Sequence, residues 1–283
     1  MSKYPEYQKT RESFGIGVLG TTMVEVEAED GTIGFAVTTG GVPAAYLIEH
    51  HFKRFVVGKT PDQTELMFDQ MYNASLFYGR KGLTINAISA VDCAVWDLRG
   101  RLLGEPVWAM IGGKVRDRQP MYATTPRPDL AMQMGFTAAK IPSPYGPAHG
   151  QEGLAENVRL AARWRETCGP DFPLAYDCWM ALTPEYALRL IEALKPYRFK
   201  WIEECLPPDD YAGYGTLVAQ RSHPIWITTG EHEYTRYGFE NLLATGVEMV
   251  QPDVTWCGGL TELLKIKEMA AARDCLVVPH GSS

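Results

Sequence analysis

The first part of the chain alternates apolar and polar residues with the period of a β-strand. Four apolar residues stand among threonines and glutamates between positions 15 and 28: Val18, Val24, Val26 and Ala28. The turn signal Glu29-Asp30-Gly31 follows, and a second apolar run covers 33–37. Two such runs joined by an acidic residue and glycine predict a β-hairpin.

After Gly40 and Gly41 the apolar period changes to that of a helix. Three helical stripes are expected, over 45–56, 66–77 and 84–103. The third stops at Gly104 with Pro106 just beyond, which is typical of a helix C-terminus. We therefore predict that residues 1–118 form an α+β domain.

Beyond residue 118, short apolar runs alternate with helical segments. Seven such runs are present, at 121–123, 136–139, 172–176, 199–202, 225–228, 248–250 and 276–278. Strands that alternate with helices at this spacing predict βα units and a parallel sheet. The units recur without sequence identity, which favours a barrel or a doubly wound sheet over a solenoid. Residues 119–283 are the second predicted domain.

A polar residue stands at or just past the end of six of these runs: Lys140, Asp177, Glu203, Glu231, Asp253 and His280. Each interval between them is long enough for one strand, one helix and two loops. In a closed (β/α) barrel the C-terminal ends of all strands face one mouth, where active sites of this fold are built. These residues are therefore predicted to converge on one pocket.

Three of the six, Asp177, Glu203 and Glu231, are carboxylates on consecutive predicted strands. Hard oxygen ligands in this number suit Mg²⁺, which keeps other positions for water and substrate. Any one of them alone is more simply explained as a helix cap or a loop acid. Asp253 and His280 follow on the next two strands, and a carboxylate beside an imidazole makes it the stronger base that proton abstraction requires.

Composition excludes several classes of protein. The chain has 283 residues, 46% hydrophobic and 22% charged, enough for about two domains with a sizeable core. A net charge of −7 without a basic block argues against nucleic-acid binding. No apolar run approaches the roughly 18 residues that span a bilayer, and no secretory signal is recognisable, so a cytoplasmic protein is expected. The six cysteines are spaced singly and are interpreted as reduced packing thiols.

Motifs along nearly the whole chain resemble those of the enolase superfamily, mandelate racemase subgroup. The general ones are Ala94-Val95-Trp96-Asp97-Leu98-Arg99-Gly100, Ile111-Gly112-Gly113, Trp201-Ile202-Glu203-Glu204 and Gln251-Pro252-Asp253. The narrower ones are Arg11-Glu12-Ser13-Phe14-Gly15, Asp177-Cys178-Trp179-Met180, Glu203-Glu204-Cys205-Leu206-Pro207-Pro208, Gly230-Glu231-His232, Trp256-Cys257-Gly258-Gly259-Leu260 and Val278-Pro279-His280-Gly281. Within the subgroup, the narrower motifs resemble the rhamnonate-type sugar-acid dehydratases.

The resemblance implies an α/β fold in which an α+β capping domain is followed by a (β/α)7β barrel. It implies that Asp177, Glu203 and Glu231 hold Mg²⁺, which binds the carboxylate of a sugar acid such as L-rhamnonate. His280, made more basic by Asp253, would remove the proton α to that carboxylate. The imidazolium would then protonate the departing 3-hydroxyl, leaving a 2-keto-3-deoxy acid.

Three further residues are expected to contact the substrate: Arg11, Lys140 and His232. His232 is equally well explained as a loop histidine. Lys140 is expected near the substrate carboxylate or near a metal ligand, and the alternative is a strand-end cation that snorkels to solvent. Racemising relatives carry a Lys-x-Lys pair on the second strand, where this chain has Lys140-Ile141-Pro142. The missing second base favours elimination over racemisation.

The expected partners are the sugar acid and, by analogy with the relatives, further copies of the chain in a homo-oligomer.

The chain departs from the resemblance at both ends. An eighth strand bearing a glutamate is implied, whereas this sequence stops three residues after His280. Residues before Met1 that complete the first cap strand and supply a substrate loop are implied as well. The barrel is therefore expected to be truncated before its eighth strand. Two alternatives stay open: a dehydratase for another aldonate, and a catalytically inactive truncated paralogue.

Overall fold

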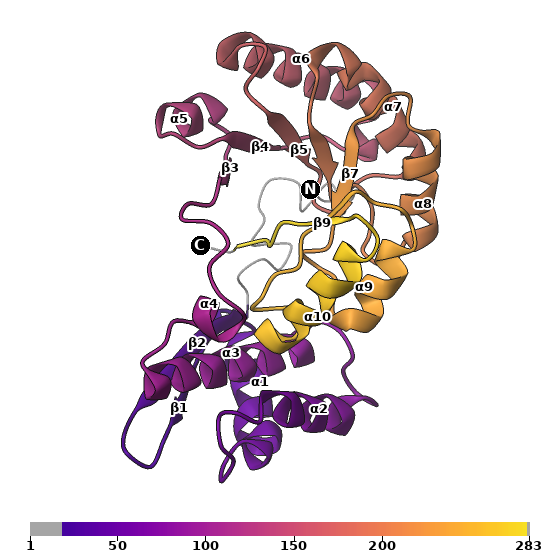
Figure 1. Ribbon diagram of the computed structural model, residues 1–283. Helices are drawn as coiled ribbons and strands as arrows, with labels where there is room; N and C mark the ends of the chain where they lie inside the picture. Colours follow the sequence, from indigo (N-terminus) through magenta and orange to yellow (C-terminus); the bar gives the residue numbers. More distant parts are fainter. Residues whose placement is uncertain (1–18, 282–283) are drawn as a thin grey trace. The chain divides into compact units, whose positions relative to one another are not determined.

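The computed structural model describes residues 19–281, which form two compact units (Figure 1). Among the described residues, one unit comprises 118–229 and 241–249, and the other comprises 19–117, 230–240 and 250–281. Arg11 lies outside the described residues. No helix in the described part of the chain is long and apolar enough to cross a membrane.

The unit that contains the N-terminal part of the described chain begins with the predicted hairpin. Strands β1 (Thr21–Glu27) and β2 (Ile33–Thr39) pair antiparallel. The helices that follow are α1 (Gly41–Leu47), the π-helical turn η3 (Ile48–Phe52), the 3₁₀ turn η4 (Lys53–Phe55), α2 (Thr64–Ser75), α3 (Leu83–Leu103) and α4 (Val107–Met110). The single helix expected over 45–56 is thus divided into the end of an α-helix, a π-helical turn and a 3₁₀ turn. Ile48 and Phe52, at the two ends of the π turn, are both buried, so the irregular turn contributes to the core.

Helix α3 forms the centre of this unit's core. Most of its side chains are buried, and it packs against the β1–β2 hairpin and against α2 (Figure 1). Gly34 permits the close approach, because a Cβ atom there would lie 2.2 Å from the backbone nitrogen of Leu98. The helix ends at Gly104, whose left-handed φ of 68° confirms the predicted stop.

Helix α3 also caps helix α10 (Gly259–Ala271) of the same unit through long-range hydrogen bonds. The Thr261 backbone N–H donates to Asp92 Oδ2 at 3.0 Å, and the Gly258 N–H donates to Ser89 Oγ at 2.8 Å. The residue that precedes α10 supplies no side-chain cap, so α3 satisfies donors that the helix start would otherwise leave unpaired. Burial raises the pKa of Asp92 from 3.8 to about 7.

The raised pKa of Asp92 is expected to lower the free energy of unfolding as the pH rises from about 4 to about 7. A carboxyl whose pKa is raised by folding binds more protons in the native state, and each unit of difference is worth about 1.4 kcal/mol. Asp92→Asn keeps an acceptor for the Thr261 N–H and should remove this part of the pH dependence. Urea unfolding of both proteins at about pH 5 and about pH 8 measures it. An equal pH dependence in the two proteins would contradict the role given to Asp92.

The parallel sheet runs through seven short strands in sequence order: β3 (Tyr122–Thr124), β4 (Ala138–Pro142), β5 (Leu174–Asp177), β6 (Trp201–Glu203), β7 (Trp226–Thr229), β8 (Met249–Val250) and β9 (Leu276–Val277). All seven strands expected from the apolar runs are confirmed. The helices after α4 are α5 (Pro128–Gln133), η5 (Pro147–His149), α6 (Gly150–Cys168), α7 (Pro184–Leu194), η6 (Lys195–Tyr197), α8 (Tyr211–Gln220), α9 (Thr235–Leu243) and α10. In Figure 1, α6, α7 and α8 line the outer side of strands β4 to β7. A sequential parallel order is that of a (β/α) barrel, because a doubly wound sheet reverses its strand order.

Strands β3, β5, β6 and β7 each end one residue beyond the apolar run that predicted them, and β4 ends three residues beyond its run. Asp177 and Glu203 are the last residues of β5 and β6, and Lys140 lies inside β4. These three polar residues therefore belong to the sheet itself, and the hydrogen bonds between the strands fix the positions of their Cα atoms.

Candidate active site

Asp177 and Glu203 lie side by side at the ends of two neighbouring strands. The register pairs Asp177 of β5 with Glu203 of β6, and Pro142 of β4 with Asp177. Residues opposite one another in a sheet project from the same face. Two of the predicted metal ligands are thus brought together by the strand register.

Lys140 connects these two carboxylates. Its ammonium lies 3.1 Å from Asp177 Oδ2 and also forms an ion pair with Glu203 Oε1, and its side chain is 1% exposed. Since the side chain is buried, the interpretation as a cation that snorkels to solvent is wrong. The indole N–H of Trp201 donates to Glu203 Oε2 at 3.1 Å. Asp177 and Glu203 therefore converge on one positive charge within a buried polar group.

The segments that follow β5 and β6 are tied together beyond the strands. The backbone N–H groups of Cys178, Met180 and Leu182 donate to the carbonyls of Glu203 at 2.9 Å, Glu204 at 2.6 Å and Cys205 at 2.8 Å. Three residues here have left-handed backbones although none is glycine: Trp179, Met180 and Glu204. Such conformations cost free energy and occur often at functional sites. These three hydrogen bonds fix the distance between the segments that follow Asp177 and Glu203.

The other unit contains the predicted acid–base pair. Asp253 and His280 form an isolated parallel bridge, and His280 Nδ1 lies 2.8 Å from Asp253 Oδ2. The second carboxylate oxygen of Asp253 accepts hydrogen bonds from the backbone N–H and the hydroxyl of Thr255, both at 2.7 Å. With Nδ1 directed at Asp253, Nε2 is the nitrogen of His280 that can exchange a proton with a substrate.

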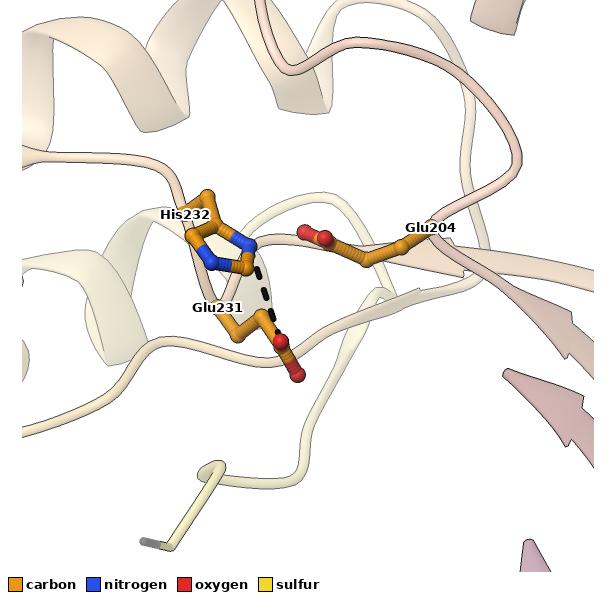
Figure 2. A group of neighbouring side chains, drawn as sticks. All are labelled: Glu204, Glu231 and His232. Atoms are coloured by element: carbon orange, nitrogen blue, oxygen red, sulfur yellow. Dashed lines mark ion pairs between the residues drawn. The ribbon is translucent and has the colours of Figure 1, made fainter. Parts of the chain in front are cut away.

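Glu231 and His232 lie beside this pair in the same unit. Glu231 Oε2 is 3.4 Å from His280 Nε2, and Glu231 Oε1 is 3.5 Å from His232 Nδ1, the ion pair drawn in Figure 2. Glu231 is buried, whereas the side chains of His232 and His280 are about one-fifth exposed. The structure therefore places the imidazoles of His232 and His280 beside the Glu231 carboxylate. Asp253 contacts the other nitrogen of the His280 ring.

Trp256 is a member of this group that sequence reasoning did not assign. Its ring centroid is 5.3 Å from that of His280 and 5.6 Å from that of His232, tilted against both imidazoles. The sequence contains a signal for it, since Trp256 begins one of the narrower motifs and follows Asp253 by three residues. Trp201, two residues before Glu203, was likewise recognised only as part of a motif.

The predicted ligand set fits Mg²⁺ by its chemistry. Asp177, Glu203 and Glu231 offer only carboxylate oxygens, which Mg²⁺ prefers. Asp177 and Glu203 already share one cation, the Lys140 ammonium, so their oxygens are arranged to meet a positive charge. The residues present are thus compatible with the metal that the sequence predicts.

Two family models cover most of the chain. The N-terminal domain of the mandelate racemase/muconate lactonizing enzymes matches residues 18–112, and the enolase C-terminal domain-like family matches residues 128–283. The chain belongs to the mandelate racemase/muconate lactonizing enzyme family. This family membership and the sheet topology confirm the expectation of a capping domain followed by a barrel-type α/β domain in the enolase superfamily.

Several members of the family are similar to this chain over its full length. The L-rhamnonate dehydratase of Saccharopolyspora erythraea is 56% identical over 100% of this chain and 73% of its own length. A crystal structure of L-rhamnonate dehydratase from Gibberella zeae matches with a TM-score of 0.96 and 50% identity, over 99% of this chain and 72% of that one. A structure of the Gibberella zeae enzyme complexed with Mg gives a TM-score of 0.97 and 49% identity, over 100% and 70% of the two chains. The resemblance to rhamnonate-type dehydratases is thereby confirmed.

Proposed function

We propose that this protein is a Mg²⁺-dependent hydro-lyase that converts L-rhamnonate into 2-keto-3-deoxy-L-rhamnonate and water. The observation that carries the proposal is the His280–Asp253 pair, held at 2.8 Å in a chain that is 56% identical to an L-rhamnonate dehydratase. A histidine whose Nδ1 is held by a carboxylate presents Nε2 as a base near neutral pH.

Asp177, Glu203 and Glu231 would hold the metal. Bound Mg²⁺ would neutralise the negative charge that develops on the substrate carboxylate when its α-proton leaves. Lys140, between Asp177 and Glu203, would add a second positive charge near the same carboxylate. Arg11 and His232 are the other proposed substrate contacts.

His280 would perform both proton transfers. Nε2 takes the proton from C2, and the electron pair of the C–H bond moves into the substrate carboxylate, which becomes an enediolate. That electron pair then returns to form the C2–C3 double bond of an enol as the C3–O bond breaks. The same Nε2–H protonates the departing hydroxyl, so that water leaves and His280 returns to its neutral form. The enol then takes a proton at C3 and becomes the ketone. Asp253 keeps the imidazole oriented through both transfers.

The residues on β4 support elimination over racemisation. Racemisation needs a base on each face of the substrate. Pro142 is paired with Asp177 at the position where racemising relatives carry a second lysine, and proline offers no base. One acid–base residue is sufficient for the loss of water.

A panel of sugar acids with and without metal tests the proposal. The full-length protein should release a 2-keto-3-deoxy acid from L-rhamnonate with Mg²⁺, and excess EDTA should abolish the release, because the enediolate charge would lose its counter-ion. D-gluconate and D-galactonate serve as competing substrates, and semicarbazide trapping of the ketone measures turnover. Faster turnover of another aldonate would favour the first alternative, and no turnover of any aldonate would favour the inactive paralogue.

Two broader expectations also belong to this proposal. Homo-oligomers are supported by exposed apolar side chains on the outer face of the β1–β2 hairpin, such as Met23, Phe35 and Val37. A cytoplasmic location is supported by six cysteines that are all free thiols, as in reducing compartments.

A further inference from the structure

Glu233 is a buried acid that the proposed reaction does not use. It lies two residues after Glu231, and only 1% of its surface is exposed. The Tyr234 backbone N–H donates to its Oε1 at 2.7 Å. The carboxylate lies so close to helix α9 that a Cβ atom at Gly238 would be 2.1 Å from Oε1. A buried carboxylate is costly unless a cation and hydrogen-bond donors compensate it.

Lys81 supplies that cation. Its ammonium lies 2.9 Å from Glu233 Oε1 and 3.3 Å from Oε2, so it contacts both carboxylate oxygens. Lys81 lies between α2 and α3, 152 residues before Glu233 in the chain but in the same unit. Its side chain is 38% exposed, so the pair has one buried partner and one at the surface.

The pair closes one end of the turn that carries two candidate site residues. The Glu233 N–H donates to the Gly230 carbonyl at 3.1 Å, which places Glu231 and His232 in the middle of the turn. Just beyond, the Thr235 N–H donates to the Cys257 carbonyl at 2.9 Å. The buried Glu233 side chain therefore fixes one end of the turn, and its ion pair with Lys81 stabilises that position.

We infer that Lys81 is a positioning residue for Glu231, acting through Glu233. The inference rests on the proposed function in one respect, the role of Glu231 as a metal ligand. Without Lys81 the buried Glu233 carboxylate would lose the ammonium that contacts both of its oxygens, and the turn that it holds would shift. The Glu231 carboxylate would then lose its present orientation, in which it lies beside His232 and His280.

Direct binding of Mn²⁺, measured by electron paramagnetic resonance on the full-length protein, tests this inference without relying on turnover. Lys81→Met should weaken Mn²⁺ binding about 10- to 100-fold, the usual cost of losing a group that orients a metal ligand. Lys81→Arg should restore most of the affinity, because it restores the positive charge. Lys53→Met is the matched control, since Lys53 forms an exposed ion pair with Glu49 and should leave binding unchanged.

A double-mutant cycle separates an effect through Glu233 from an effect elsewhere. The loss in Lys81→Met/Glu233→Gln should be no larger than in Lys81→Met alone, because both changes break the same contact. Wild-type affinity in Lys81→Met, or losses that multiply in the double variant, would overturn the inference. If Lys81→Met does not fold, Glu233→Gln decides: weaker Mn²⁺ binding supports the inference, and wild-type binding overturns it. Mn²⁺ binding without dehydration of L-rhamnonate would defeat the proposed function and leave this inference standing.

Discussion

The His280→Asn variant is expected to lose L-rhamnonate dehydration by a factor of about 10² to 10⁴ in kcat, the contribution typical of a general acid–base group. Asparagine can still contact Asp253, but it cannot carry a proton between C2 and the departing hydroxyl. The measurement is ketone release by the full-length protein at saturating Mg²⁺ and substrate.

His50→Asn provides the matched control for this variant. His50 is exposed, and its ring contacts the Tyr46 carbonyl, so its replacement should leave kcat unchanged. Circular dichroism and the thermal midpoint should show that both variants fold as the wild type does. Retention of wild-type turnover by a folded His280→Asn would show that another residue moves the proton.

Lys140→Met is expected to lower the free energy of unfolding by about 3 to 5 kcal/mol in EDTA, the usual cost of breaking a buried ion pair from one side. Asp177 and Glu203 would repel each other across the strand register once the shared ammonium is gone. Excess Mg²⁺ should restore part of the loss, because a ligand that binds only the native state stabilises it.

Urea unfolding with EDTA and with Mg²⁺ measures both effects. Lys195→Met, which changes an exposed lysine in η6, is the matched control and should leave both curves in place. An unchanged unfolding free energy for Lys140→Met in EDTA would contradict the buried ion-pair network. Loss of stability that Mg²⁺ does not reduce would contradict the placement of the metal at Asp177 and Glu203.

The strands could be predicted because each follows a short apolar run that is bounded by helices and turn residues. Helix α3 could be predicted to within one residue because Gly104 and Pro106 give a local stop signal. Lys140 was harder, since a lysine after an apolar run is equally compatible with a solvent-seeking strand end. Only the register of β4, β5 and β6 shows that its two partners lie next to it.

Contacts between distant parts of the chain left no local signal. Lys81 meets Glu233 across 152 residues, and Asp92 meets the Thr261 N–H across 169. Neither pair changes the hydrophobic period of its own segment, so period and spacing cannot detect it. The π turn η3 could not be predicted for the same reason. The packing of the folded chain, and not the local sequence, decides where a helix widens to a π turn.

Dehydration of L-rhamnonate in D₂O tests the central claim most directly. If His280 removes the C2 proton and an enol forms by loss of the 3-hydroxyl, the wild-type product carries a single deuterium at C3, and folded His280→Asn forms almost none of it. Nuclear magnetic resonance and mass spectrometry of the product measure both. A product without deuterium at C3, or equal product formation by His280→Asn, would contradict α-proton abstraction by His280.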